Sequence, residues 1–158
     1  MQKIPQKQIL QLDNRYRTTA TIYLAQIFTT VILITVGLFF IDNFQGSASA
    51  TTLTALWAVI VFIAIGSFVL RRMLSRWERL KDIKLLKGIA GVLSALQTNA
   101  ILHGSLAETI AVIGFTITAL NGEKADVLRA GGVALIIFLM NFPRKSVWKK
   151  IAANLEKV

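Results

Sequence analysis

Residues 52–70 read TLTALWAVIVFIAIGSFVL, and residues 71–87 continue the chain with RRMLSRWERLKDIKLLK. The first stretch carries no charge, and its length is close to the ~20 apolar residues with which an α-helix crosses a bilayer. The second stretch holds seven Lys and Arg residues, and such cationic flanks mark the cytoplasmic side of a membrane span. The two stretches together predict a transmembrane helix whose second end lies in the cytoplasm.

The other basic residues follow the same pattern. Of the 18 Lys and Arg residues in the chain, only Lys124 and Arg129 lie outside three segments that apolar runs separate. The first and third segments contain Lys3, Lys7, Arg15 and Arg17, and Arg144, Lys145, Lys149, Lys150 and Lys157. Because cationic loops stay on the cytoplasmic side, we expect both termini and the central basic stretch to share that side.

Over the whole chain, the hydropathy pattern predicts an all-α, polytopic membrane protein that forms a single membrane domain over residues 1–158. It has four transmembrane helices arranged as two hairpins, with both termini cytoplasmic. The expected spans lie at about 18–41, 52–70, 101–120 and 127–142. Between the hairpins we expect a basic, amphipathic cytoplasmic linker at 71–100, and after them an amphipathic tail at 144–158.

Local signals predict where several of these helices begin and end. A short interfacial helix is expected after Pro5. The second helix should continue past Leu70, since no helix breaker precedes Gly88. The pair Asn121–Gly122 should end the third span, and Pro143 should end the fourth.

Composition excludes several classes of protein. Hydrophobic residues make up 54% of the chain and charged residues 16%, with a mean hydropathy of +0.61, which is too apolar for a soluble domain of this size. The net charge of +10 sits at the ends of apolar runs, so it favours anionic lipid head groups over nucleic acid. The absence of Cys and the single His argue against disulfides and metal clusters. The marked positive-inside bias and the small size favour a bacterial inner membrane.

Glu108 is the one acidic residue well inside an apolar span. It precedes the expected outer end of its span by 12 residues, or roughly 18 Å at ~1.5 Å per residue, which places it near mid-membrane. A carboxyl at that depth costs about 2.5–3.5 kcal/mol to insert. We expect it to face the bundle, with hydroxyls offered by Ser105 and Thr109. It could lock two helices together, or it could carry protons or bind sodium.

Small residues surround Glu108 and recur in the fourth span. Small side chains let membrane helices approach closely, so we expect helix packing at Gly104, Ala107, Ala111, Gly114, Gly131 and Gly132. Residues 105–120, SLAETIAVIGFTITAL, resemble the carboxylate-bearing helix of the ring (c) subunits of rotary ATP synthases. In that helix an aliphatic run with a Gly six residues later follows the Glu, and Glu108 and Gly114 match this layout. The resemblance implies Glu108 as a reversible ion carrier in a rotating ring.

His103 lies five residues before Glu108, about 140° away around the helix, so the two side chains do not share a face. A lone His in a bundle can hydrogen-bond at a helix contact, or it can contact a haem, a pigment or a quinone. No cofactor is required by the sequence, which contains no phosphate-binding loop and no catalytic constellation.

The central basic stretch has two interpretations: a solvated flank of the second span, or a surface that docks on anionic lipid or on an acidic partner. Its basic residues are Arg71, Arg72, Arg76, Arg79, Lys81, Lys84 and Lys87, and we expect Glu78 and Asp82 to pair with them locally. The leading hypothesis for function is a non-catalytic accessory or assembly subunit of a larger membrane complex. The alternatives are an ion-translocating subunit that uses Glu108 and, below it, a pigment- or quinone-binding subunit that uses His103.

Overall fold

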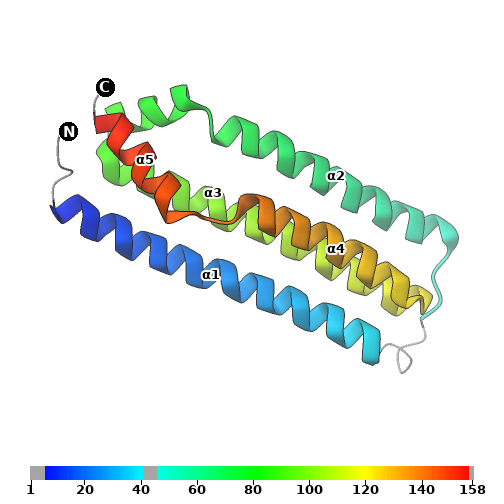
Figure 1. Ribbon diagram of the computed structural model, residues 1–158. Helices are drawn as coiled ribbons and strands as arrows, with labels where there is room; N and C mark the ends of the chain where they lie inside the picture. The colour runs from blue at the N-terminus through cyan, green and yellow to red at the C-terminus, as the bar shows by residue number, and fades with distance from the viewer. Residues whose placement is uncertain (1–5, 41–45, 157–158) are drawn as a thin grey trace.

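The computed structural model describes residues 6–40 and 46–156 of the chain, which form five helices and no strand (Figure 1). The all-α prediction is therefore confirmed for this part of the chain. The expectations for Lys3, Ile41, Lys157 and the loop residues 42–45 lie outside the described residues. The helices are α1 (Gln6–Phe39), α2 (Ala50–Leu74), α3 (Trp77–Asn121), α4 (Lys124–Asn141) and α5 (Lys145–Glu156).

Three of these helices, α1, α2 and α3, are each long and apolar enough to cross a membrane. The helix α4 meets that criterion only together with α5, and the two are bent by 41° at their junction. The expected fourth span is therefore the first arm of a bent pair. Its own 18 residues reach only about 27 Å at ~1.5 Å per residue.

The helices α3 and α4 lie side by side at the centre of the bundle, with α1 and α2 on opposite flanks (Figure 1). In the most apolar window of each helix, 44% of the residues are buried in α3, against 17% in α1 and 11% in α2. The shared core is built from α1, α2, α3 and α4. It contains Tyr23, Ile60, Ile110, Ile117 and Phe138. α3 is thus the central helix, and most of the apolar surface of α1 and α2 faces outward, as lipid-facing helices require.

Capping residues explain several helix ends. The Ser49 hydroxyl accepts a hydrogen bond from the Thr52 N–H at 3.2 Å and so caps the start of α2. At the end of α3, Gly122 adopts a left-handed conformation (φ 75°), and its N–H bonds to the Thr118 carbonyl at 2.8 Å. The expected stop at Asn121–Gly122 is confirmed. Asn141 is the last residue of α4, two residues before Pro143, as expected.

The central basic stretch differs from the prediction. α2 continues past Leu70 but ends at Leu74, well before Gly88. The chain turns at Ser75, whose N–H bonds to the Arg71 carbonyl at 3.1 Å, and Arg76 is extended. A second bend follows at Gly88, with φ 64° and ψ −171°, a conformation that only glycine adopts readily. The expected linker at 71–100 is therefore no separate segment, because α3 runs from Trp77 through the bend into the third span.

Packing at this end of the bundle accounts for both bends. Leu80 lies before Gly88 and Val92 after it, and both are buried against Leu155 of α5. Burying a Leu or Val side chain gains about 1.5–3 kcal/mol, which offsets the cost of interrupting the helix. A second cluster of Leu12, Leu93, Trp148 and Ala152 joins α1, α3 and α5.

The beginning of α1, the α2–α3 turn and the end of α5 all lie at one end of the bundle (Figure 1). The described members of the three basic clusters are therefore grouped at one end, as the charge pattern predicted. The short interfacial helix expected after Pro5 is instead the first part of α1, which runs without a break from Gln6 to Phe39.

Candidate functional site

A cavity of about 370 Å³ lies at the basic end of the bundle, where α2, α3, α4 and α5 meet. We call it the interfacial cavity. Its polar lining residues are Arg71, Ser75, Asn99, His103, Asn141 and Arg144, and Trp148 is among its apolar ones. Its volume falls within the ~300–1,000 Å³ range of small-molecule sites. Among the ion-, cofactor- and lipid-binding candidates predicted from the sequence, His103 and Arg71 are the described residues that line this cavity.

His103 is almost completely buried, with 5% of its surface exposed. Its Nδ1 lies 3.4 Å from the hydroxyl oxygen of Ser67 on α2, and this contact fixes the imidazole ring between α3 and α2. The hypothesis of a hydrogen-bonded His at a helix contact therefore has a named partner. Because the ring also borders the interfacial cavity, a ligand in that cavity would meet it.

Glu108 lies on another side of α3. It is half-buried, and it forms no hydrogen bond and no ion pair with any residue in the described part of the chain. The expected hydroxyl partners are engaged elsewhere. Thr109 donates to the Ser105 carbonyl at 2.8 Å, and the Ser105 hydroxyl accepts from Gln26 Nε2 at 3.0 Å. The predicted hydrogen bonds of Glu108 with these two hydroxyls are therefore absent among the described contacts: the Thr109 hydroxyl donates within its own helix, and the described contact of the Ser105 hydroxyl is with α1.

Gln26 of α1 was not a candidate in the sequence, although it lies eight residues into the first predicted span. Its Oε1 is buried and has no hydrogen-bond donor among the described residues. It packs directly against Gly104, where an added Cβ would overlap that oxygen. Since residues three apart on a helix are neighbours, Ser105 and Glu108 share the side of α3 that faces α1. A polar group of Gln26, Ser105 and Glu108 therefore lies along this seam, and we call it the α1–α3 polar seam.

Most of the small residues serve helix packing as predicted. Ala107 and Ala111 are buried, a Cβ on Gly114 would overlap the Ala130 Cβ, and a Cβ on Gly131 would lie 2.5 Å from Ile34 Cδ1. Gly132 is the exception, because a Cβ there would meet no atom within 4 Å. Gly132 therefore makes no helix contact within the described part of the chain, since it turns toward open space while its neighbour Gly131 faces α1.

The residues of the basic stretch are mostly exposed. Lys84 donates a hydrogen bond to the Leu155 carbonyl and thereby ties α3 to the end of α5. The expected local pairs are absent, because neither Glu78 nor Asp82 forms an ion pair with a residue that the structure describes. The described basic residues of this stretch therefore have little local neutralisation, which strengthens the positive potential at this end.

One ion pair at the basic end was not predicted. Lys145 Nζ lies 3.0 Å from both carboxylate oxygens of Asp13 and so links α5 to α1. The hydrogen bond from Lys145 holds the pKa of the Asp13 carboxyl below its usual value of 3.8. The two residues are far apart in sequence, so only the charges themselves could have suggested this contact.

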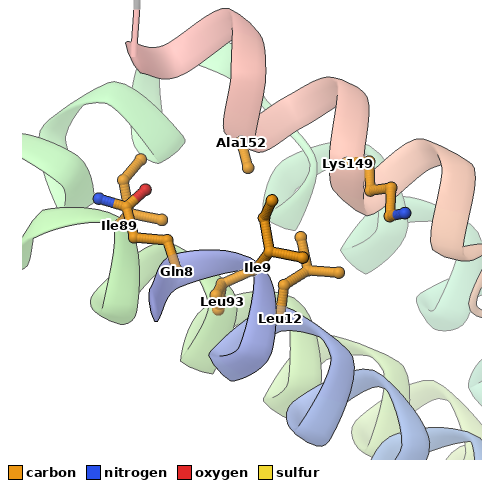
Figure 2. A pocket seen from close by; sticks show the side chains of 7 residues that line it. All are labelled: Gln8, Ile9, Leu12, Ile89, Leu93, Lys149 and Ala152. Atoms are coloured by element: carbon orange, nitrogen blue, oxygen red, sulfur yellow. The ribbon is translucent and has the colours of Figure 1, made fainter. Parts of the chain in front are cut away.

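A smaller cavity of about 90 Å³ lies between α1, α3 and α5. Figure 2 shows Ile9, Leu12 and Leu93 gathered on one side of it and Ala152 of α5 on the other. Its lining is almost entirely apolar, and an apolar cavity of this size is expected to stay dry. We assign it no ligand.

No group of three or more His, Asp or Glu side chains in the described residues could hold a metal ion. Comparisons with known protein families, with curated proteins and with solved structures find no match to this chain. The resemblance of residues 105–120 to the ring subunits therefore stays a prediction. Within the chain, Gly114 of that stretch is used for packing against α4.

Proposed function

We propose that this chain is a small, non-catalytic accessory or assembly subunit of a larger complex in a bacterial inner membrane, with both termini in the cytoplasm. One observation carries the proposal: Glu108 is half-buried in a membrane-spanning segment and has no partner among the described residues. Acidic groups at membrane depth normally pair with another polar group or face a bundle interior. A donor on a neighbouring subunit that packs over the α1–α3 polar seam would complete the environment of Glu108.

The rest of the seam supports a protein neighbour over lipid. The Gln26–Ser105 hydrogen bond is exposed at the surface of the isolated chain, and lipid tails offer these two side chains no hydrogen-bonding group. Hydrogen bonds across membrane helices contribute about 0.6 kcal/mol each on average. Together with close packing they would be enough to orient a partner, and no catalytic group is needed for this role.

Replacement of Glu108 tests the proposal. The tagged chain is purified in mild detergent, and the co-purifying subunits are identified and quantified by mass spectrometry. Glu108→Ile should reduce the yield of the partner several-fold, whereas Thr109→Val should not, because the Thr109 hydroxyl is bonded within its own helix. Recovery of the chain without a stoichiometric partner would contradict the proposal. So would a partner yield that Glu108→Ile leaves unchanged.

A second function uses the same carboxyl. A protonatable Glu beside Ser105 and Gln26 offers oxygen ligands to a proton or a sodium ion, so Glu108 is also a candidate for ion translocation. Glu108→Gln distinguishes the two functions, because it keeps a polar group but cannot ionise. It should leave assembly intact under both, and it should abolish ion-dependent work only if Glu108 carries the ion. In that case sodium or high pH should also block carbodiimide labelling of the native Glu108.

The orientation is tested separately. The chain contains no Cys, so single-cysteine variants report topology without further changes. Ser47→Cys and Arg76→Cys lie at exposed positions at opposite ends of α2. An impermeant maleimide added to intact cells should label the first variant and not the second. Labelling of both from the same side would refute the proposed topology.

A further inference from the structure

We propose that the interfacial cavity binds the phosphate group of a negatively charged ligand, and that an anionic phospholipid head group is its source. The cavity lies at the basic end of the bundle, where α2 leaves the expected membrane region and α4 gives way to α5. This inference rests on the chemistry of the cavity wall and is independent of the accessory role and of Glu108.

The charged groups of the wall are all cationic. Arg71 comes from α2 and Arg144 from the α4–α5 junction, and none of the described residues that line the cavity is an Asp or a Glu. Neither arginine forms an ion pair or a side-chain hydrogen bond with any described residue. Guanidinium groups bind phosphate oxygens through paired, charge-assisted hydrogen bonds. Two such groups around one cavity, both without an internal partner, fit a phosphate-bearing ligand.

The helix ends around the cavity are arranged to tolerate an anion. The C-terminal carbonyls of α2 and α4 would repel a phosphate, but one side-chain amide lies against the last carbonyl of α2 and another against a carbonyl near the end of α4. Asn99 Nδ2 lies 3.5 Å from the Leu74 carbonyl, and Asn141 Nδ2 lies 2.9 Å from the Ile137 carbonyl. The helix α5 begins directly after Arg144, so its unpaired N–H groups add positive potential at the rim.

An apolar surface continues from the cavity and favours a lipid over free phosphate. An open groove of about 690 Å³ shares Arg71 and Ser75 with the cavity and is also lined by Phe68 and Val69. These two apolar side chains are about half exposed, at 51% and 52%, and lie toward the membrane-spanning part of α2. Acyl chains can follow them while the phosphate stays between the arginines. Trp148 lines the same cavity, and Trp is enriched at membrane interfaces.

The test uses the full chain, purified and washed free of lipid in detergent. Native mass spectrometry and thermal unfolding are recorded with dioleoylphosphatidylglycerol, with dioleoylphosphatidylcholine and with inorganic phosphate. The double variant Arg71→Gln, Arg144→Gln removes the two cavity charges. The double variant Arg79→Gln, Lys150→Gln removes the same charge from exposed positions outside the cavity. We expect the first to weaken phosphatidylglycerol binding by about tenfold or more and the second to change it less than about twofold.

Each outcome decides the proposal. Selective binding of phosphatidylglycerol that only the cavity variant loses supports a lipid head group. Protection by inorganic phosphate that only the cavity variant loses supports the phosphate site and assigns it to free phosphate. Equal binding of both lipids, or equal losses in both double variants, overturns the proposal. If the cavity variant does not fold, Val147→Trp fills the cavity from an exposed lining position and keeps both arginines. It should then block binding, and full retention of binding overturns the proposal.

Discussion

The packing of α3 against α4 can be tested with one substitution at two glycines. A Cβ added to Gly114 would overlap the Ala130 Cβ, whereas a Cβ added to Gly132 would meet no atom within 4 Å. Both glycines are helical, so Gly→Ala gains about 1 kcal/mol of helix propensity at each position. At Gly114 the new methyl group must also push α4 away, because the Ala130 methyl is fixed to its backbone and cannot rotate aside. Overpacking of this kind costs about 1–3 kcal/mol.

The propensity gain cancels when the two variants are compared, so the difference in their unfolding free energies reports the overpacking alone. We expect Gly132→Ala to be as stable as the native chain or slightly more stable, and Gly114→Ala to be less stable than Gly132→Ala by about 1–3 kcal/mol. Unfolding by sodium dodecyl sulfate in mixed micelles, followed by circular dichroism, measures the difference. Equal stability of the two variants would refute the close contact between Gly114 and Ala130.

The remaining predictions concern two tyrosines and one ion pair. Tyr23 is fully buried, and its hydroxyl donates to the Phe138 carbonyl at 2.9 Å. Tyr23→Phe should therefore lower the unfolding free energy by about 1 kcal/mol in the same assay. Tyr16→Phe removes no described hydrogen bond and should lower it much less. Equal costs would contradict the assigned bond. The pKa of Asp13 is lowered from 3.8 by Lys145, so the ion pair stabilises the fold above that pH and the contribution is lost as the pH falls through the folded pKa. The melting temperatures of the native chain and of Asp13→Asn should therefore differ at neutral pH and converge in acid. If the difference in melting temperature does not change with pH, the pair does not stabilise the fold.

The helices were predictable from the sequence because their cause is local. Uncharged apolar runs must satisfy their backbone groups internally in a membrane, and Gly122 ends α3 through its own backbone conformation. The turn at Ser75 was not predictable. The sequence around it, RRMLSRW, contains no strong helix breaker, and the fold breaks there because Leu80 and Val92 pack on Leu155, which is remote in sequence.

The candidate site was predictable only in part, for a related reason. Hydropathy and charge single out His103, Glu108 and Arg71 as residues of interest, but they do not show which of them meet. Whether Gly131 or Gly132 contacts α1 depends on the rotation of α4 about its axis. The interfacial cavity lies where α5 continues from α4 at a 41° bend and packs on α3, and it is lined by Arg144 at that bend and by Arg71 of α2.

The polar side chains of α3 fall into three kinds, according to where their hydrogen-bond partners lie. Thr109 and Thr116 bond to carbonyls of their own helix, so they make no demand on neighbours. His103 and Ser105 bond across to α2 and α1, and they complete the fold of the single chain. Glu108 does neither within the described residues. Since an unpaired acidic group in a membrane is costly, the position of Glu108 fits the proposed contact with a partner subunit, and it equally fits the proposed binding of a transported ion.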